Sequence, residues 1–294
     1  MPRKKILITG SQGFVGRNLR RVLEPDYDIA GFDISLSVFH NITAQEQVYA
    51  FFEKERPNIV IHLAANPDVA KSAEFPQEDL YLNTLGTINV LEACRRYPVE
   101  LMFLSSSAVV YGELETQAFS ESHPLRPTTP YGIGKLAAEQ YCNLYFRRYQ
   151  VPAVIFRLFN IYGPGQSRNF AIPNMVARIR EAGPEMEMFG NEHDTRDFVF
   201  IEDICEAFRT AIEKKPAGCT FNIATGKETR LLEVAETIAR VLNKSVRFFY
   251  KPQAKDANRV TRILGDPSFV ARTIGWKSRF NLEAGLTKLI HPAG

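Results

Sequence analysis

The sequence predicts an α/β fold in which helices cover both faces of a parallel sheet, and two observations lead to that prediction. Short apolar runs alternate with helix-like stretches over the first half of the chain, as in a doubly wound sheet. The first apolar run ends in a glycine-rich turn that leads directly into a helix-like stretch. With 294 residues, of which 45% are apolar and 23% charged, the chain can form one large core.

Strand-like and helix-like runs follow one another in a regular order. Strands are predicted at Lys4–Thr9, Tyr27–Asp33, Asn58–Leu63, Glu100–Ser105 and Ala153–Phe159. Helices are predicted at Gly16–Leu23, Gln45–Arg56, Leu80–Arg96, Tyr131–Tyr149, Ile201–Lys214 and Leu231–Leu242. Because a helix separates each early strand from the next, we expect these strands to lie parallel.

The chain changes character after Tyr162, where the Gly163–Gly165 segment interrupts it. We predict that residues 1–164 form the sheet domain and that segments near 196–224 return to it. Residues 165–294 are predicted to form mainly a smaller, mixed α/β lobe that binds substrate.

Composition and charge exclude several classes of protein. The net charge of +3, from 36 basic and 33 acidic residues, is too balanced to indicate nucleic-acid binding. The basic N-terminal residues precede too short an apolar run for a signal peptide, and no run approaches the ~18 apolar residues of a membrane span. We therefore expect a cytoplasmic protein with reduced thiols. The cysteines lack the ligand spacing of a zinc site, so no metal is predicted: Cys94, Cys142, Cys205 and Cys219.

The glycine-rich turn predicts a dinucleotide site. Gly10, Gly13 and Gly16 join the first strand to the first helix, where glycine permits a tight turn and the helix N-terminus attracts a pyrophosphate. Asp33 ends the second strand, where a carboxylate accepts hydrogen bonds from the adenosine ribose and repels a 2′-phosphate. These features indicate a Rossmann-type domain that binds NAD rather than NADP. The alternatives are an ordinary strand–helix turn and an ordinary turn residue at Asp33.

A tyrosine and a lysine four residues apart form the candidate catalytic pair. Thr129 and Pro130 suit the cap and first position of a helix, so Tyr131 and Lys135 share one helical face. We expect the Lys135 ammonium to lower the pKa of Tyr131 and make it a usable base. Ser107 follows the fourth strand, where it can hydrogen-bond the same substrate oxygen. The alternative is a surface pair on a helix.

Together these motifs resemble the extended short-chain dehydrogenases/reductases, in particular their NAD-dependent nucleotide-sugar epimerase/dehydratase group. UDP-glucose 4-epimerase is the best-known type of that group. The matching motifs extend over nearly the whole chain: TGSQGFVG (9–16), HLAA (62–65), NTLGT (83–87), SSSAVVYG (105–112), YGIGK (131–135), RLFNIYGP (157–164), RDFVFIED (196–203), FNIATG (221–226) and GW (275–276) with its following helix.

The resemblance implies which residues contact the cofactor, and it places them at four positions along NAD. These are Gly10, Gln12, Gly13, Phe14 and Val15 at the pyrophosphate; Asp33 at the ribose; Asn41 and Ile42 at the adenine; and Leu63, Ala64, Asn83 and Lys135 along the rest. Asn41 departs mildly from the group, which usually has aspartate there.

The resemblance also implies contacts to the substrate, a nucleotide-diphosphate sugar. Asn160 and Arg196 would bind its diphosphate, and Ser107 the sugar hydroxyl. An ion pair of Arg196 with Asp197 or Glu202 is the alternative for that residue. Arg259 is a second candidate phosphate ligand, although its spacing is irregular.

One departure from the group narrows the expected reaction. The 4,6-dehydratases carry an Asp-Glu pair, and the sugar-acid decarboxylases a glutamate, shortly after the catalytic hydroxyl; here Ala108 and Val109 stand there. The leading expectation is a 4-epimerase that moves hydride transiently from C4 to NAD through a 4-keto sugar, while Tyr131 exchanges the proton.

Two other functions stay open. An NDP-4-keto-6-deoxyhexose reductase, of the GDP-linked type among others, is favoured by the short Gly163–Phe170 run. A non-catalytic NAD-binding sensor or scaffold is disfavoured by the retained Tyr131 and Lys135. For either enzyme, the resemblance implies a homodimer that pairs the Leu80–Arg96 and Tyr131–Tyr149 helices of two chains.

Overall fold

The computed structural model describes residues 3–113, 117–188, 190–251 and 261–292, and its centre is a parallel six-stranded sheet. The strand order is β10-β5-β4-β3-β1-β2. The chain therefore adds β2 on one side of β1 and the later strands on the other side, as predicted for a doubly wound fold. The strands are β1 (Lys5–Thr9), β2 (Asp28–Phe32), β3 (Ile59–His62), β4 (Leu101–Ser107), β5 (Ala153–Leu158) and β10 (Thr220–Ile223).

Helices cover both faces of this sheet, because successive side chains of each strand point to opposite faces. Ile6 and Ile8 of β1 belong to one buried cluster, and Leu7 between them belongs to the other. The first face carries α1 (Phe14–Leu23) and α8 (Ile201–Lys214); the second carries α2 (Gln45–Glu55), α5 (Gly86–Arg96) and α6 (Pro130–Tyr149).

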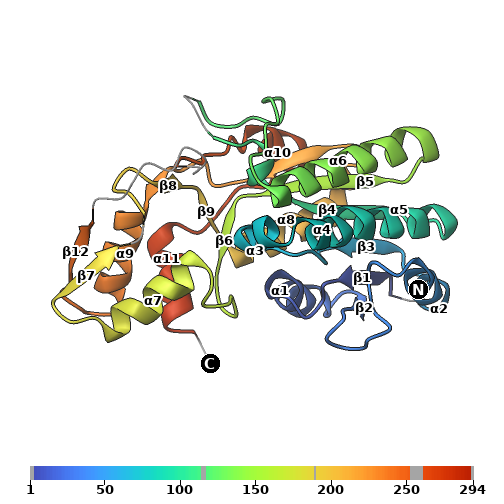
Figure 1. Cartoon of the computed structure of the whole chain (residues 1–294). Helices are drawn as coiled ribbons and strands as arrows, with labels where there is room; N and C mark the ends of the chain where they lie inside the picture. Colours follow the sequence, from blue (N-terminus) through green and yellow to red (C-terminus); the bar gives the residue numbers. More distant parts are fainter. Residues whose placement is uncertain (1–2, 114–116, 189, 252–260, 293–294) are drawn as a thin grey trace.

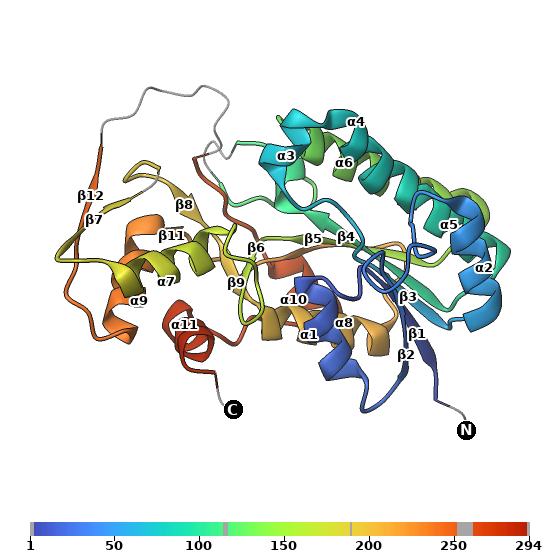
Figure 2. The same ribbon diagram turned by 60° about the horizontal axis from the view of Figure 1, so that its bottom comes forward.

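A second lobe lies beside one end of the sheet (Figures 1 and 2). Its parallel pair β7–β12 lies near α9, which packs against both α7 and α11, while β6 pairs with β9 and leads from the sheet toward the lobe. The bounds are β6 (Asn160–Tyr162), α7 (Ala171–Glu181), β7 (Glu185–Met188), β8 (Thr195–Arg196), β9 (Phe198–Phe200), β11 (Thr229–Arg230), α9 (Leu231–Val241), β12 (Arg247–Tyr250), α10 (Ser268–Ile274) and α11 (Leu282–Ile290).

The predicted fold class is confirmed, with one local difference. The predicted helix Leu80–Arg96 begins as a π-helical segment, η1 (Leu80–Leu85), before it continues as α5. Two short helices precede it, α3 (Val69–Glu74) and α4 (Pro76–Asp79). They are too short to show helical periodicity in the sequence.

Two further sequence predictions concern organisation. The strand β10 lies within the segment expected to return to the sheet, and it pairs with β5. The division of the chain at residue 164 stays a prediction. No helix among the described residues is long and apolar enough to cross a membrane.

Candidate active site

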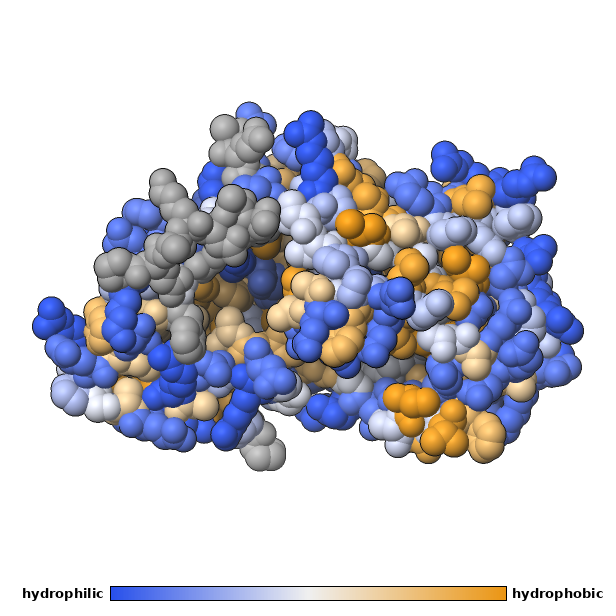
Figure 3. Space-filling view, in the orientation of Figure 1, coloured by the Kyte–Doolittle hydropathy of each residue, from blue (hydrophilic) through white to orange (hydrophobic). Residues whose placement is uncertain are grey.

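The C-terminal ends of β1, β3, β4 and β5 open into a cavity of about 1100 Å³. Since a typical small-ligand pocket has ~300–1,000 Å³, this cavity is large for a single small ligand. Figure 3 shows the molecule hollowed between the sheet and the second lobe. The predicted site residues that line the cavity are Gly10, Gln12, Gly13, Phe14, Val15, Asp33, Asn41, Ile42, Leu63, Ala64, Ser107, Tyr131, Lys135 and Asn160.

The glycine-rich turn has a backbone that only small residues permit. Gly10 has φ +69°, and a Cβ there would lie 2.8 Å from the backbone nitrogen of Ala64. A Cβ on Gly16 would lie 2.4 Å from the carbonyl oxygen of Gly10. Gly13 caps α1 without a side-chain hydrogen bond, so the first amides of this helix are left for another acceptor. This arrangement suits the pyrophosphate of a dinucleotide.

Asp33 lies directly beside this turn. Its Oδ2 accepts a hydrogen bond from the Gln12 backbone at 2.8 Å, and its Oδ1 accepts from the Ser35 amide and hydroxyl. Burial alone would raise the pKa of Asp33, but the hydrogen bonds from Ser35 and Gln12 outweigh it and hold the pKa below its usual value. Asp33 therefore presents a negative charge at the end of the cavity.

The buried side chain of His62 lies next to Thr9, the residue that precedes the glycine-rich turn. The Thr9 hydroxyl oxygen accepts from the amides of Leu63 and Ala64 at 3.2 Å, and it lies 2.7 Å from Nδ1 of His62. Nε2 of His62 lies 3.1 Å from the Thr87 hydroxyl, which itself donates to a backbone carbonyl. These roles assign the His62 proton to Nε2. Burial, with a smaller effect of the Lys135 charge, lowers the pKa of His62 to about 3 and keeps it neutral.

Beside the Asp33 end of the cavity, the Asn41 side chain forms a local turn. Its Oδ1 accepts from the Thr43 amide at 3.0 Å and from the Thr43 hydroxyl at 2.9 Å. Ile42 is buried beside it, and its carbonyl accepts from Asn89 at 3.0 Å. Both predicted residues line the cavity, and Asn41 also orders the loop that follows Asp33.

The three predicted catalytic side chains meet in the middle of the cavity. The Thr129 hydroxyl caps α6 by accepting from Gly132 at 3.1 Å, and Pro130 is the first helical residue, both as predicted. The Lys135 ammonium lies 5.8 Å from the Tyr131 ring centroid and donates to the carbonyl of Ser105, at the end of β4, at 2.9 Å. The helix and the strand end thus orient the pair.

The expected lowering of the Tyr131 pKa is wrong for this arrangement. Burial raises the pKa of Tyr131 to about 12, which interaction with the Ser107 side chain partly offsets and the charge of Asp79 increases. Burial also lowers the pKa of Lys135 to about 8, against the opposing influence of Asp79. The sequence pattern shows the spacing of the pair but not its dehydration, and dehydration disfavours the charged form of both groups.

A buried ionic network holds the catalytic helix against the sheet. Arg157 of β5 pairs with Glu139 of α6 at 2.7 Å, with side chains 6% and 1% exposed. The same guanidinium donates to the Tyr111 hydroxyl at 2.8 Å, and this hydroxyl donates to Asn222 of β10 at 2.7 Å. Breaking a buried pair by removing one partner costs ~3–5 kcal/mol. The motif residues Tyr111, Arg157 and Asn222 therefore stabilise the fold beneath the site.

Of the other three predicted site residues, two are absent from the cavity lining. Asn83 is buried behind it, where it donates to Asp79 and accepts from the backbone of Asn66. Arg196 is absent from the cavity lining and donates to the carbonyls of Thr195 and Thr261. The third, Arg259, lies outside the described residues.

The alternative predicted for Arg196 was an ion pair with Asp197 or Glu202. Asp197 is buried and accepts from Thr225, Gly226 and Gly265. Glu202 pairs with Lys288 at 2.8 Å. Each carboxylate thus has partners of its own in the second half of the chain.

Sequence reasoning missed a cation at the cofactor turn. Arg17 lines the cavity and donates to the carbonyl of Gln12 at 2.7 Å and to that of Gly165 at 3.1 Å. It joins the glycine-rich turn to the segment that leads into the second lobe. Its position directly after Gly16 was the available signal. Other unpredicted lining residues include Val69, Tyr81, Gln166, Phe170 and Ile263.

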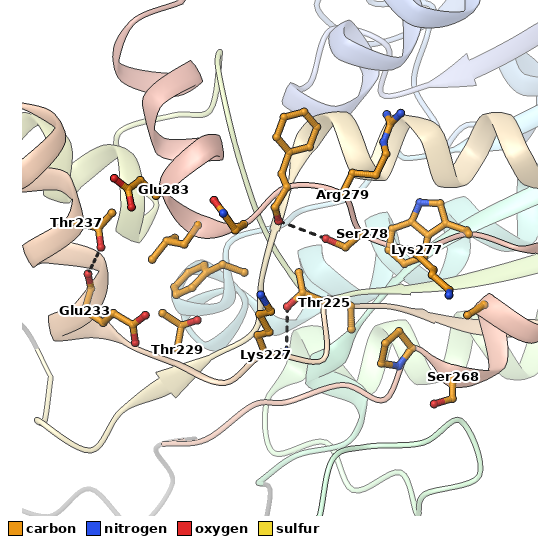
Figure 4. A pocket seen from close by; sticks show the side chains of 18 of the residues that line it. Thr225, Lys227, Thr229, Glu233, Thr237, Ser268, Lys277, Ser278, Arg279 and Glu283 are labelled. Carbon is orange, nitrogen blue, oxygen red and sulfur yellow. Dashed lines mark hydrogen bonds between the residues drawn. The ribbon is translucent and has the colours of Figure 1, made fainter.

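A second cavity, of about 820 Å³, lies between α9, α10 and the segment before α11 (Figure 4). It contains none of the predicted site residues. Arg240 pairs with Glu283 at 3.1 Å on its rim. Figure 4 shows Lys227, Lys277 and Arg279 pointing in different directions, so these cations do not converge on one ligand. Among the described residues, no cluster of acidic, histidine or cysteine side chains suits a metal ion.

Comparison with known proteins identifies the family. The model of the NAD dependent epimerase/dehydratase family matches residues 6–224. The chain is 31% identical to UDP-glucose 4-epimerase of Mycolicibacterium smegmatis, over 97% of both chains. It is 30% identical to dTDP-D-glucose 4,6-dehydratase of Homo sapiens, over 98% of this chain and 89% of that one. A UDP-glucose 4-epimerase of Thermotoga maritima, solved with UDP-glucose, superposes with a TM-score of 0.89 at 28% identity over 97% of both chains. The chain belongs to the NAD dependent epimerase/dehydratase family, and this confirms the predicted family and the predicted cofactor, NAD.

Proposed function

We propose that this protein is an NAD-dependent nucleotide-sugar 4-epimerase. The observation that carries the proposal is the pairing of Tyr131 and Lys135 with two apolar neighbours, Ala108 and Val109, at the end of β4. Elimination of water needs an additional acid and base beside the sugar, and these two side chains have neither. Proton exchange at one sugar hydroxyl needs only Tyr131.

The turn residues fit a dinucleotide. The amides at the start of α1 would bind the pyrophosphate, and Asp33 would accept hydrogen bonds from the ribose hydroxyls. When bound, NAD supplies the acceptor and donor of the hydride at C4 and a positive charge near Tyr131. Ser107 would orient the 4-hydroxyl, and Asn160 would contact the diphosphate.

The role of Tyr131 follows from its surroundings. As base it takes the proton of the 4-hydroxyl while that carbon is oxidised, and as acid it returns the proton to the 4-keto oxygen. Because burial raises the pKa of Tyr131 to about 12, the phenolate needs nearby positive charge. Lys135, on the same face of α6, supplies part of it.

Product analysis tests this proposal. An epimerase interconverts two nucleotide sugars of equal mass with a catalytic amount of NAD and no net NADH. The second candidate, a 4-keto-6-deoxyhexose reductase, is favoured by the short Gly163–Phe170 connection between β6 and α7. It would consume one NADH per sugar and add two hydrogens. Mass spectrometry of product and cofactor distinguishes the two.

We further propose a homodimer formed by η1, α5 and α6. Large apolar side chains on η1 and α6 are exposed, among them Leu80 at 52%, Ile133 at 58% and Leu144 at 44%. Figure 3 shows apolar side chains on the face over α4 and α6. Exposed apolar surface on packed helices is typical of an interface.

Light scattering tests the dimer, which should have twice the chain mass of 33.3 kDa. The Leu144→Glu variant should be monomeric because it buries a charge in the interface. Val38→Glu, at a more exposed apolar position after β2, is the control and should stay dimeric. A wild-type monomer at micromolar concentration contradicts the proposal.

A further inference from the structure

Asp79 is a buried carboxylate that none of the roles above uses. It ends α4 and is 1% exposed. Its Oδ1 accepts from Asn83 at 2.7 Å and from Asn66 at 3.5 Å. Its Oδ2 is buried without a hydrogen-bond partner among the described residues. A buried carboxylate oxygen without a donor is costly, so its place in the fold needs a reason.

The free oxygen of Asp79 lies against the catalytic helix. A Cβ added to Gly134 would lie 3.0 Å from Oδ2, so the glycine between Tyr131 and Lys135 leaves room for the carboxylate. The hydroxyl of Thr84, on η1, donates to the carbonyl of Gly134 at 3.2 Å and holds the same turn. The carboxylate is thus fixed beside the turn of α6 that carries both catalytic side chains.

Several titratable groups face Lys135 from the surrounding elements. They are Asp79 of α4, Glu139, Cys142 and Tyr131 of α6, and His62 of β3.

Of these groups, Asp79 is the carboxylate available to stabilise the charged form of Lys135. Glu139 already pairs with Arg157 at 2.7 Å, and His62 is neutral because burial lowers its pKa to about 3. Burial lowers the pKa of Lys135 to about 8, and the largest opposing influence is Asp79. The same carboxylate also raises the pKa of Tyr131.

We propose that Asp79 is a positioning residue whose buried carboxylate is the counter-charge that keeps the Lys135 ammonium protonated beside Tyr131. The inference rests on the proposed function, because a protonated Lys135 matters only where Tyr131 transfers the substrate proton. Because Oδ2 accepts no hydrogen bond from the described residues, no donor offsets the negative charge of Asp79 on the side that faces α6.

The Asp79→Asn variant tests this electrostatic role with little change in shape. A nearby opposite charge shifts a pKa by about one unit or more, so loss of the Asp79 charge should lower the pKa of Lys135 by about one unit. The pKa of Tyr131 should also fall, since the carboxylate raises it. Both limbs of the kcat/KM–pH profile should therefore move to lower pH, with about tenfold less activity on the alkaline limb.

A readout without substrate keeps this inference separate from the proposed function. In protein labelled with ¹³Cε-lysine, NMR titration follows the Lys135 resonance, which is assigned by its loss in Lys135→Met. The Asp79→Ser variant removes the charge without placing an amide against Gly134 and should give the same shift. Glu74→Gln removes an exposed carboxylate from neighbouring α3 and should give none.

The outcomes are distinct. A folded Asp79→Asn protein with an unchanged Lys135 titration overturns the inference, as does a uniform loss of kcat without a pH shift, which indicates a structural role alone. A shifted Lys135 titration in a protein that turns over no nucleotide sugar supports the counter-charge and contradicts the proposed enzyme. An active wild type with no shift contradicts only the role of Asp79.

Discussion

The two ends of the large cavity differ in what lines them: mainly backbone at one end and side chains at the other. The end where we propose that the cofactor binds is mostly backbone, contributed by the contiguous turn 10–15, and Asp33 accepts a hydrogen bond from Gln12 of this turn. The other end is a wall of single side chains from distant elements, such as Asn160, Phe170 and Ile263. A backbone site requires glycine wherever a Cβ would clash, whereas a side-chain wall accepts many residue types. The cofactor was therefore predictable from sequence, and the sugar was not.

The largest expected effect is at the point where the two ends meet. Tyr131→Phe removes the hydroxyl that we propose exchanges the substrate proton, so kcat should fall by ~10²–10⁴, the usual contribution of one general base. NAD affinity, measured by calorimetry, should be nearly unchanged because the glycine-rich turn is intact. An equal loss of NAD binding would show that the two ends are not separable.

The next effect concerns the charge at the cofactor end. Asp33→Asn keeps an oxygen for the Gln12 amide but removes the repulsion of a 2′-phosphate, so the ratio of NADP to NAD affinity should rise by ~10–100-fold. Asp28→Asn, at an exposed position at the start of the same strand, is the control. Tighter binding of NADP by the wild type would refute this account of Asp33.

A smaller effect comes from the histidine beneath the turn. The folded pKa of His62 is about 3 and its unfolded value is about 6.5, so between these values the unfolded chain binds more protons. The contribution of His62 to stability is therefore present above pH 6.5 and declines below it, by roughly 2 kcal/mol at pH 5. Denaturant unfolding at pH 7 and pH 5 measures this decline. The His62→Gln variant should be less stable at pH 7 but should lose less stability on acidification.

The smallest effect is expected on the side-chain wall. Asn160→Ala removes one proposed hydrogen bond to a charged diphosphate, so KM for the nucleotide sugar should rise about tenfold. The values of kcat and the NAD affinity should change little. Steady-state kinetics with saturating NAD measures KM and kcat separately. A matching loss of NAD affinity would place Asn160 at the cofactor instead.

Particular residues show where prediction from sequence succeeded and failed at this site. The Thr129 cap, the Pro130 start and the shared face of Tyr131 and Lys135 were predictable because they depend on local helix geometry. Asn83 belongs to a recognisable motif but lies behind the cavity, where it binds Asp79. Its side-chain direction depends on how η1 packs against α6, and that contact is long-range.

The parallel sheet, the dinucleotide turn and the family were predictable from sequence, because each depends on local spacing: alternating strands and helices, glycines at one turn, and a tyrosine and a lysine four residues apart on one helix. The pKa shifts of Tyr131 and Lys135, and the shape of the other end of the cavity, depend instead on tertiary packing. Burial raises the pKa of Tyr131 and lowers that of Lys135, and Asp79 reaches them from another helix. Desolvation and contacts between distant segments depend on how the whole chain packs, and no local pattern records them.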